Sequence, residues 1–358
     1  WPEFRWDHEK LAGLLAEVRH HQGRLLGKME SLGFSLQNEA SLETITLDVL
    51  KSSEIEGEML NPEQVRSSVA RQLGIDIAGM VPADRDVEGI VEMMLDATQN
   101  HQEPLTEERM FNWHATMFPT GRSGIHKIVV GGWRNNPKDD PMQVVSGRLD
   151  RAVVHYQAPD YDILPHEMTL FLDWFNSESK QDPVIKAAIA HLWFVTIHPF
   201  DDGNGRIARA ITDMQLARAD KTKQRFYSMS AQIRKERKQY YDILEKIQKG
   251  DLDITEWIQW FLDCLDRAML TTDETLSAVL KKAKFWEKYS NENLNDRQVL
   301  MLNKLLSQFV GKLTSSKWAA ITKCSSDTAI RDINDLMQKG ILVKEPAGGR
   351  STSYKFAE

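Results

Sequence analysis

The sequence predicts an all-α protein with one small β-hairpin and a C-terminal winged helix-turn-helix module. Three observations carry this prediction. Amphipathic patterns with apolar residues at helical spacing dominate the chain. Short β-branched runs broken by Gly, Asn and Pro occur in the stretch 123–147. After residue 285 the patterns follow the order helix, helix, helix, strand, strand, which is typical of a winged helix.

The composition is that of an ordinary globular protein with more than one domain. The 358 residues are long for one domain, and 41% are hydrophobic and 27% charged. The formal net charge of -7 argues against nucleic-acid binding by the chain as a whole. Cys264 and Cys324 are too few for a disulfide framework and lack metal-ligand spacing. We see no signal peptide and no apolar run long enough to cross a membrane, so we expect a cytoplasmic protein without a membrane partner.

Helices are expected through the first part of the chain. The stretch 40–58 has apolar residues at helical spacing, and Gly57 is placed to stop this helix. The stretches 85–101 and 106–118 are also amphipathic, and Thr106 can cap the second of them.

A hairpin and a buried helix are expected next. The segment NNPKDDP (135–141) lies between β-branched runs and predicts the tip of a hairpin. The stretch 183–200 is apolar nearly all round, which predicts a helix at the centre of a bundle. This helix should end near Ile197, because Pro199 disfavours helical backbone at the residue before it. Two further helices are expected at 164–178 and 203–219.

The C-terminal module is expected at 285–358, after a linker near 281–296. Its helices are predicted at 296–309, 315–322 and 325–340, its strands at 341–346 and 352–356, and the turn between the strands at 347–351. The module has 11 Lys and Arg against 8 Asp and Glu, a net of +3, which is a weak footprint for DNA binding. Arg331 and Arg350 are candidate phosphate contacts. DNA binding and protein contact, including a homodimer, both stay open.

The stretch HPFDDGNGRIAR (198–209) follows the buried helix and opens the next one. Glycines permit close approach, and the free N–H groups of a first helical turn favour an anion. Arg206 and Arg209 are three residues apart, so they share a face and suit a polyphosphate. The expected nucleotide ligands here are Gly203, Asn204, Gly205, Arg206 and Arg209.

Two further residues of this stretch supply the expected chemistry. His198 lies at the end of a buried helix, where it is placed as a general base. Asp202 can hold a Mg²⁺ ion that also binds phosphate. The glycine pattern is not that of a P-loop, and it does not follow a strand as in a dinucleotide-binding fold. The stretch therefore predicts attack on a nucleotide phosphate.

The stretch resembles the Fic family pattern H-x-F-x-[DE]-G-N-G-R-x-x-R and fills every specified position. The resemblance covers 86–270. It implies a helical core with a hairpin flap, and transfer of AMP from ATP, with Mg²⁺, to a Ser, Thr or Tyr hydroxyl of a target protein or of the chain itself. The roles that it implies are His198 as base, Phe200 as core anchor, Asp202 as metal ligand, Gly203 to Gly205 as anion hole, and Arg206 and Arg209 as phosphate ligands.

The resemblance also assigns a flap and an adenine site. The segment WRNNPKDDPMQVVSG matches the flap, and its edge would pair with the backbone of the target. The residues of that edge are Gln143, Val144, Val145 and Ser146. Tyr240, Tyr241 and Gln248 lie where the family often meets adenine; for the two tyrosines, packing is the open alternative.

The segment SSEIEG (52–57) resembles the inhibitory motif of the family, [ST]-x-x-x-E-[GN]. Ser52 and Glu56 are four apart and share a helical face, and Gly57 completes the motif. A carboxylate aimed at Arg209 would occupy the arginine that the ATP γ-phosphate needs. We therefore expect 1–85 to be an N-terminal helical domain that carries this motif and 86–280 to be the catalytic core.

The resulting hypothesis is a Mg²⁺-dependent protein adenylyltransferase that is inhibited by its own Glu56. Two alternatives stay open. One keeps the site but removes AMP or transfers another phosphate-containing group. The other is a DNA-binding regulator whose core only senses nucleotide.

Overall fold

The computed structural model describes residues 3–77, 80–146, 153–289, 291–306, 309, 311–345 and 352–357. The chain forms two compact units, Trp1–Thr272 and Asp273–Glu358. Both are mostly helical, and the strands in the described ranges form three two-stranded sheets. Helix α11 (Thr255–Lys288) continues through the first half of the stretch 281–296, so this part of the expected linker is helical. No helix within the described residues combines the length and the apolar character that a membrane crossing needs.

The helices expected in the first unit are confirmed, and the structure adds others. The remaining helices described in this unit are α1 (His8–Glu30), α2 (Phe34–Ile55), α3 (Pro62–Leu73), α4 (Arg85–Gln99), α5 (Glu107–Met117), α6 (Leu164–Asn176), α7 (Pro183–Ile197), α8 (Asn204–Asp220), α9 (Met229–Lys235) and α10 (Arg237–Gln248), with a 3-10 turn at Tyr161–Ile163. Thr106 caps α5, because its hydroxyl accepts the backbone N–H of Arg109 at 3.1 Å.

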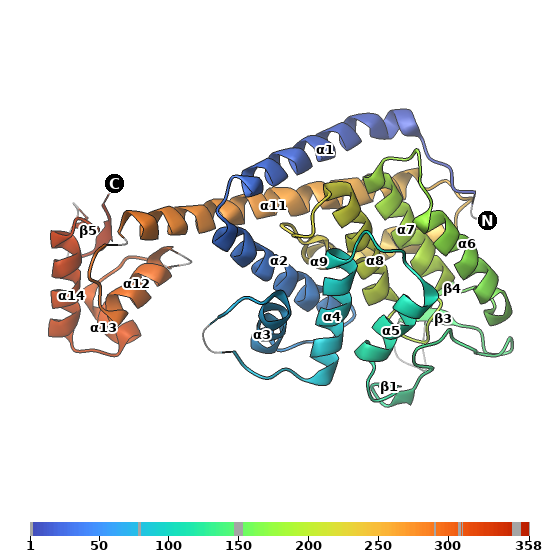
Figure 1. Cartoon of the computed structure of the whole chain (residues 1–358), viewed down its shortest axis with the longest axis horizontal. Helices are drawn as coiled ribbons and strands as arrows, with labels where there is room; N and C mark the ends of the chain where they lie inside the picture. Colours follow the sequence, from blue (N-terminus) through green and yellow to red (C-terminus); the bar gives the residue numbers. More distant parts are fainter. Residues whose placement is uncertain are drawn as a thin grey trace. The chain divides into compact units, whose positions relative to one another are not determined.

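Helix α7 is the buried centre of the first unit. All of its residues from Val184 to Ile197 are buried, as the all-round apolar pattern predicts. It packs against α6 and α8, and α8 in turn contacts α2, α4 and α5. Helix α2 also packs against α3, α4 and α9 (Figure 1). These contacts bring the N-terminal helices onto the element that begins in the GNGR sequence.

The predicted hairpin tip at 135–141 is wrong. Strand β3 (Gln143–Ser146) pairs antiparallel with β4 (Val153–Gln157), so the turn of this hairpin falls in 147–152, outside the described residues. The segment 135–141 instead forms a loop before the hairpin. Its turn-forming residues mark a chain bend in either case, and Pro137 and Pro141 lack the N–H that a strand ladder needs. A small hairpin of β1 (Arg122–Ser123) and β2 (His126–Lys127) was not predicted.

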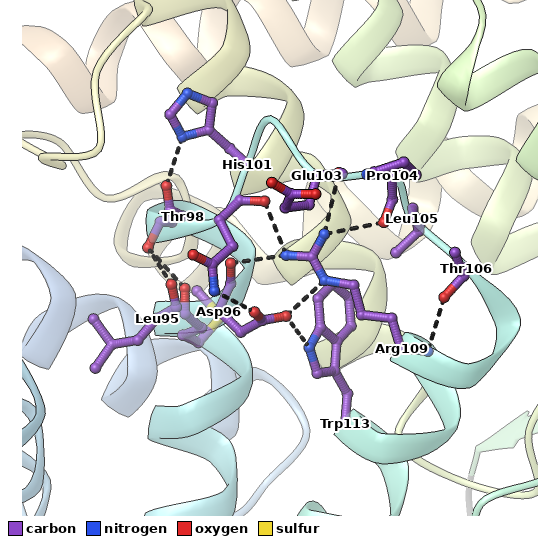
Figure 2. Close-up of polar contacts among 12 residues, drawn as sticks. Leu95, Asp96, Thr98, His101, Glu103, Pro104, Leu105, Thr106, Arg109 and Trp113 are labelled. Atoms are coloured by element: carbon purple, nitrogen blue, oxygen red, sulfur yellow. Dashed lines mark hydrogen bonds and ion pairs between the residues drawn. The ribbon is translucent and has the colours of Figure 1, made fainter.

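A polar network fixes the angle between α4 and α5 (Figure 2). Nε of Arg109 donates to the Asp96 carboxylate at 2.6 Å, and Nη2 donates to the carbonyls of Asp96 and Asn100 at 2.9 and 3.1 Å. The indole N–H of Trp113 donates to the same carboxylate at 2.8 Å. Arg109 thus adds further donors to two carbonyls at the end of α4, which also accept the backbone N–H groups of Asn100 and Glu103. A cleft of about 660 Å³ borders this network, lined by residues outside the 198–209 stretch.

The second unit has the predicted order of elements. These are α12 (Asp296–Leu306), α13 (Ser315–Thr322), α14 (Ser326–Gln338) and the antiparallel pair β5 (Leu342–Lys344) and β6 (Tyr354–Phe356). The core of this unit consists of Met301, Leu302, Leu313, Trp318, Ala329, Ile333, Leu336, Ile341 and Leu342. The predicted turn 347–351, with Arg350, lies outside the described residues.

Candidate active site

His198 lies where α7 ends. It is the C-cap residue, with φ 52° and ψ 57°, and its N–H donates to the Phe194 carbonyl at 3.0 Å. Pro199 explains why the right-handed helix stops here, because the residue before a proline avoids that backbone region. The left-handed region costs a non-glycine residue roughly 1–2 kcal/mol. The buried helix α7 therefore holds His198 in a strained conformation at a fixed place.

The imidazole of His198 is held in a form suited to accept a proton. Its Nδ1 lies 3.2 Å from the Val195 carbonyl oxygen, which can only accept, so Nδ1 carries the hydrogen and Nε2 keeps a free lone pair. Burial lowers the pKa of His198, and Arg134 adds to this effect. The Val195 carbonyl and the carboxylates of Glu56 and Asp202 oppose it. The ring is therefore neutral near pH 7.

Helix α8 begins in a turn that suits an anion. Gly203 has φ 82°, and a Cβ at this position would lie 3.0 Å from side-chain atoms of Met117 and Phe118. The Asn204 side chain accepts the N–H of Phe200 at 2.9 Å and donates to its carbonyl at 2.8 Å. Asn204 thus closes the turn with its side chain and offers an anion only its backbone. The first N–H groups of α8 have no intrahelical acceptors, which leaves them for a phosphate.

Asp202 is held from three sides. Its Oδ1 accepts the N–H of Gly203 at 2.6 Å, and its Oδ2 accepts the hydroxyl of Ser123. Its carbonyl lies 3.2 Å from Nε2 of His114. Among the residues that the structure describes, no group of three or more His, Cys, Asp and Glu side chains suits a metal. The single carboxylate of Asp202 fits Mg²⁺, which commonly takes one or two carboxylates and fills its shell with phosphate and water.

The end of α2 lies against the start of α8. The helix stops as predicted, with Glu56 as its cap and Gly57 in the left-handed region at φ 87°. The N–H of Glu58 donates to the Ser53 carbonyl at 3.0 Å, and that of Gly57 to the Glu54 carbonyl at 3.1 Å. These two bonds form a Schellman motif, which needs a residue such as Gly at positive φ. The motif places two carboxylates, one on either side of Gly57, at the end of the helix.

The first of these carboxylates meets Arg209. This arginine is 2% exposed, and it donates from Nε to the Ser52 hydroxyl at 2.8 Å and from Nη2 to the Ser52 carbonyl at 2.9 Å. Its Nη2 also lies 2.8 Å from Oε1 of Glu56. A Cβ on Gly205 would lie 2.1 Å from that same oxygen. The Glu56 carboxylate therefore occupies the space over the first turn of α8.

The second carboxylate meets Arg206. Nη1 of this buried arginine donates to Oε2 of Glu58 at 2.5 Å, and its guanidinium lies 5.1 Å from the ring centre of Phe118. Glu58 is outside the inhibitory pattern, so the sequence analysis missed it. The sequence does contain a local sign of this contact, since Glu58 is a second carboxylate directly after the helix-stopping Gly57. Both arginines of the predicted anion site thus face a carboxylate from α2.

Tyr241 lies beside the end of α2. Its hydroxyl is 3.5 Å from the Ile55 carbonyl and from Oε2 of Glu56. Burial raises the pKa of Tyr241 to about 12, so the phenol stays protonated at neutral pH. Arg237, which the sequence analysis did not single out, lies 5.1 Å from the centre of the Tyr241 ring and donates to the Ile55 carbonyl at 2.7 Å. The start of α10 therefore holds the C-terminal end of α2.

The other two candidate adenine contacts lie in different surroundings. Tyr240 is buried and its hydroxyl is 2.8 Å from Nε2 of His191, which makes it part of the core. Gln248 donates to the Thr196 hydroxyl at 3.2 Å, and Tyr156 of β4 donates to the carbonyl of the same threonine at 2.9 Å. Gln248 and the flap thus meet at the last turn of α7, and the structure does not bring Gln248 to Tyr241 through any described contact.

The predicted flap carries its target-docking residues on a strand. Gln143 to Ser146 form β3, with an irregularity between Val144 and Val145, and the Val145 side chain is exposed. The sequence analysis missed Arg134 at the base of the flap. Its Nε donates to the His198 carbonyl at 2.8 Å, and its N–H donates to the Pro199 carbonyl at 2.9 Å. Arg134 therefore links the predicted flap to the turn at His198 and Pro199.

Comparison with known proteins agrees with this geometry. Residues 104–216 match the model of the Fic/DOC family, and residues 1–75 match a domain of unknown function, DUF4172. The chain is 27% identical over 246 residues to protein adenylyltransferase Fic of Drosophila willistoni, which covers 66% of this chain and 43% of that protein. It is 32% identical over 151 residues to protein adenylyltransferase Fic of Culex quinquefasciatus, which covers 40% of this chain and 27% of that protein.

A solved structure supports the fold. A Fic family protein from Desulfovibrio desulfuricans superimposes with a TM-score of 0.53 and 21% identity, and the match covers 97% of this chain and 95% of that one. At this identity the likeness concerns the fold. The chain spans less than half the length of the two curated relatives above.

Proposed function

Because residues 104–216 match the Fic/DOC family, we propose that the chain is a protein adenylyltransferase of this family, which transfers AMP from ATP to a Ser, Thr or Tyr hydroxyl of a target protein or of itself. Residues 86–280 would form the catalytic core, and residues 1–85 would carry the inhibitory helix. The observation that supports this most is the start of α8. There a neutral His198, the Asp202 carboxylate and two buried arginines accompany a helix start whose first N–H groups have no intrahelical acceptors.

The proposed reaction is an in-line attack on the α-phosphorus of ATP. The lone pair on Nε2 of His198 takes the proton of the target hydroxyl as its oxygen bonds to the α-phosphorus. The bond between the α-phosphorus and the bridging oxygen breaks, and pyrophosphate leaves. The backbone N–H groups of the first turn of α8 stabilise the negative charge on the phosphate oxygens. Arg206 and Arg209 hold the β- and γ-phosphates and so fix the line of attack.

A divalent cation has one evident ligand in this site. Asp202 would hold Mg²⁺, which supplies positive charge against the phosphate oxygens of the nucleotide. The bonds to Gly203 and Ser123 orient the Asp202 carboxylate, as outer groups commonly do for metal ligands.

Under this proposal, the position of Glu56 in the described structure is that of the inhibited state. Glu56 takes a hydrogen-bonding face of Arg209 and fills the space above Gly205. ATP must displace this carboxylate or bind with a misplaced γ-phosphate, and either outcome slows transfer. Removing Glu56 should therefore activate the protein.

The test is AMP incorporation from α-³²P-labelled ATP into the protein itself and into lysate proteins. We compare the parent, Glu56→Gly, and Glu56→Gly with His198→Ala. The proposal requires label on protein with Glu56→Gly that disappears when His198 is also replaced. Label from other α-³²P nucleotides but not from ATP would instead indicate transfer of a different nucleotidyl group.

Removal of AMP from a modified protein is the rival at the same site. The carboxylate of Glu56 is 32% exposed beside the catalytic turn, where it could orient a water molecule. This rival predicts that Glu56→Gly abolishes AMP release from an AMP-modified protein without increasing incorporation. Measuring release and incorporation on one variant separates the two reactions.

For the second unit we propose DNA contact through α14. The acidic side chains in the middle of this helix contact α12 of the same unit, since Asp332 pairs with Arg297 at 2.8 Å and Asp335 accepts an N–H of the Gln298 side chain at 2.7 Å. Arg331 and Asn334 are exposed. Duplex DNA should then bind the full chain with an affinity that falls steeply with salt. No binding at low salt would favour protein contact or a homodimer, which sedimentation would reveal.

A further inference from the structure

His114 is a buried histidine of α5 that contacts the catalytic turn from outside the motif. Its Nε2 lies 3.2 Å from the carbonyl oxygen of Asp202, and its Nδ1 lies 3.2 Å from the backbone nitrogen of Gly131. Its ring stacks on Phe200, with centroids 4.4 Å apart and planes 8° from parallel. The side chain is fully buried. Both ring nitrogens and one ring face are thus in contact with named groups.

These contacts determine which nitrogen carries the hydrogen. The N–H of Gly131 can only donate, so Nδ1 of His114 must accept, and the hydrogen sits on Nε2 and donates to the Asp202 carbonyl. The position of Gly131 is itself fixed, because the N–H of Val129 donates to the Asp201 carboxylate at 2.8 Å. Asp201 thus fixes the loop, and the loop fixes the orientation of the imidazole hydrogen.

The Asp202 carbonyl belongs to the peptide that leads into Gly203. The N–H of this peptide donates to the Asp202 carboxylate at 2.6 Å, so fixing the carbonyl also fixes the orientation of the carboxylate and of the first turn. We propose that His114 is a positioning residue, which holds the Asp202–Gly203 peptide so that the Asp202 carboxylate faces the divalent cation of a bound nucleoside polyphosphate. The inference rests on the proposed function for the identity of that ligand.

Two amide substitutions separate the positioning role from packing. His114→Gln can place an N–H where Nε2 lies and keep the bond to Asp202, whereas His114→Asn reaches only the Nδ1 position and keeps the bond to Gly131. Both lose the stacked ring, so their packing losses differ by only one methylene group, worth about 1 kcal/mol. In the Glu56→Gly background we expect His114→Asn to lower kcat/KM for Mg·ATP by about 10- to 100-fold, the usual cost of a lost outer contact to a metal ligand, and His114→Gln to lose only a few-fold.

The second measurement is the gain in ADP affinity on adding Mg²⁺, followed by calorimetry. His114→Asn should lose most of this gain while its Mg²⁺-free affinity stays within about 2-fold, and the concentration of Mg²⁺ for half-maximal activity should rise. His101→Asn is the matched control, since His101 is also buried but its Nδ1 faces the Thr98 carbonyl at 2.8 Å, remote from the motif. Equal losses in the Gln and Asn variants would reduce His114 to a packing residue and overturn the proposal.

A spectrum of the free protein decides the geometry without nucleotide. In a sample with ¹⁵N-labelled imidazoles, the signals that vanish in His114→Gln belong to His114. They should show the hydrogen on Nε2; a hydrogen on Nδ1, or on both nitrogens at neutral pH, overturns the proposal. If Glu56→Gly binds no ADP in any condition, the proposed function fails, and this spectrum still decides how His114 is bonded.

Discussion

The two ends of α8 carry buried ion pairs of nearly the same geometry. At the start, Nη2 of Arg209 lies 2.8 Å from the carboxylate of Glu56. Towards the far end, Arg225 lies 2.8 Å from the carboxylates of both Asp213 and Asp220. Distances alone would rank the two clusters as equals.

Solvent access separates them. The Glu56 side chain is 32% exposed, whereas those of Asp213 and Asp220 are 3% and 1% exposed. Burial raises the pKa of Asp213 well above its ordinary value. Separating Arg225 from Asp213 and Asp220 would leave unpaired charge in an apolar interior. The Glu56 carboxylate, in contrast, can move into solvent, and a phosphate can take its place beside Arg209. A buried arginine can therefore bind a ligand only when the carboxylate paired with it can move into solvent.

Helix α2 contributes a carboxylate to the cluster at each end of α8. Its Asp48 accepts the Ser228 hydroxyl and the N–H of Ser230, and it adds to the raised pKa of Asp213. Two turns further along, the same helix delivers Glu56 to Arg209. Because Asp48 is buried and bonded, the middle of α2 stays fixed, and under the proposed function only its last turn needs to move to admit ATP. Substitutions at each end of α8 test this division between a fixed end and an exchangeable end.

The largest effect should come from the fixed end. Arg225→Met leaves two buried carboxylates without their cation, and breaking a buried pair typically costs about 3–5 kcal/mol of stability. Urea unfolding followed by tryptophan fluorescence measures this loss. Arg71→Met is the control, because the Arg71–Glu88 pair is 48% and 45% exposed and should cost under about 1 kcal/mol. Equal losses in the two variants would show that the far cluster does not hold the fold.

The next effect concerns the base at the exchangeable end. In the Glu56→Gly background, His198→Ala should lower AMP transfer by about 10²-fold or more, since a general base commonly contributes that much. ATP binding should remain, because the arginines and the first turn of α8 are untouched. Transfer at the Glu56→Gly rate would remove His198 from the mechanism.

The pH profile of Glu56→Gly sharpens the same point. The folded-state pKa of His198 is lowered, so the base form persists below the ordinary histidine pKa of about 6.5. The rate should therefore be flat near pH 7 and fall only at pH values below about 6.5. The Glu56 carboxylate raises the pKa of His198, so its loss in Glu56→Gly should shift the fall in rate to lower pH. A midpoint above pH 7 would contradict a neutral, half-buried base at His198.

The third effect is the release of inhibition. Glu56→Gly should raise AMP incorporation by roughly 30- to 150-fold, which corresponds to about 2–3 kcal/mol of competition between carboxylate and phosphate. Stability should change much less than in Arg225→Met, which is the contrast between the two ends. Glu39→Ala removes an exposed carboxylate from the same helix and should leave the rate unchanged. An unchanged or lower rate in Glu56→Gly would indicate that this carboxylate takes part in the reaction.

Local signals in the sequence predicted much of this arrangement. Pro199 set the end of α7 and Gly57 the end of α2, because each restricts the backbone of one or two residues. The helical spacing of Ser52 and Glu56 was likewise local. The hairpin tip was misplaced because turn-forming residues mark a bend without specifying which strands pair.

The supporting residues could not be predicted in this way. His114 reaches Asp202 across 88 residues, and Arg134 reaches His198 across 64. Glu58 reaches Arg206 across 148 residues. Nothing in the spacing of one segment encodes such contacts, since they depend on how whole helices pack. Local pattern thus predicted the residues proposed for the chemistry, and packing decided which residues hold them.

The smallest predicted effect concerns that second pair. The Glu58 side chain is 39% exposed, and pairs with an exposed partner are worth about 0.2–1 kcal/mol, so Glu58→Gln in the parent should raise AMP incorporation only about 1.5- to 5-fold. Glu63→Gln, an exposed change on α3, is the control.

Combining Glu58→Gln with Glu56→Gly tells whether the two carboxylates act separately. If each blocks its own arginine, the two gains multiply, because ATP must displace both. If Glu58 only supports the turn that carries Glu56, its substitution should add nothing once Glu56 is gone. Rates for the parent, the two single variants and the double variant at equal Mg·ATP give the coupling directly. A fall below the parent rate in Glu58→Gln would mean that Glu58 holds Arg206 in its productive orientation, and the exchangeable end would then have one obstructing carboxylate and one supporting carboxylate.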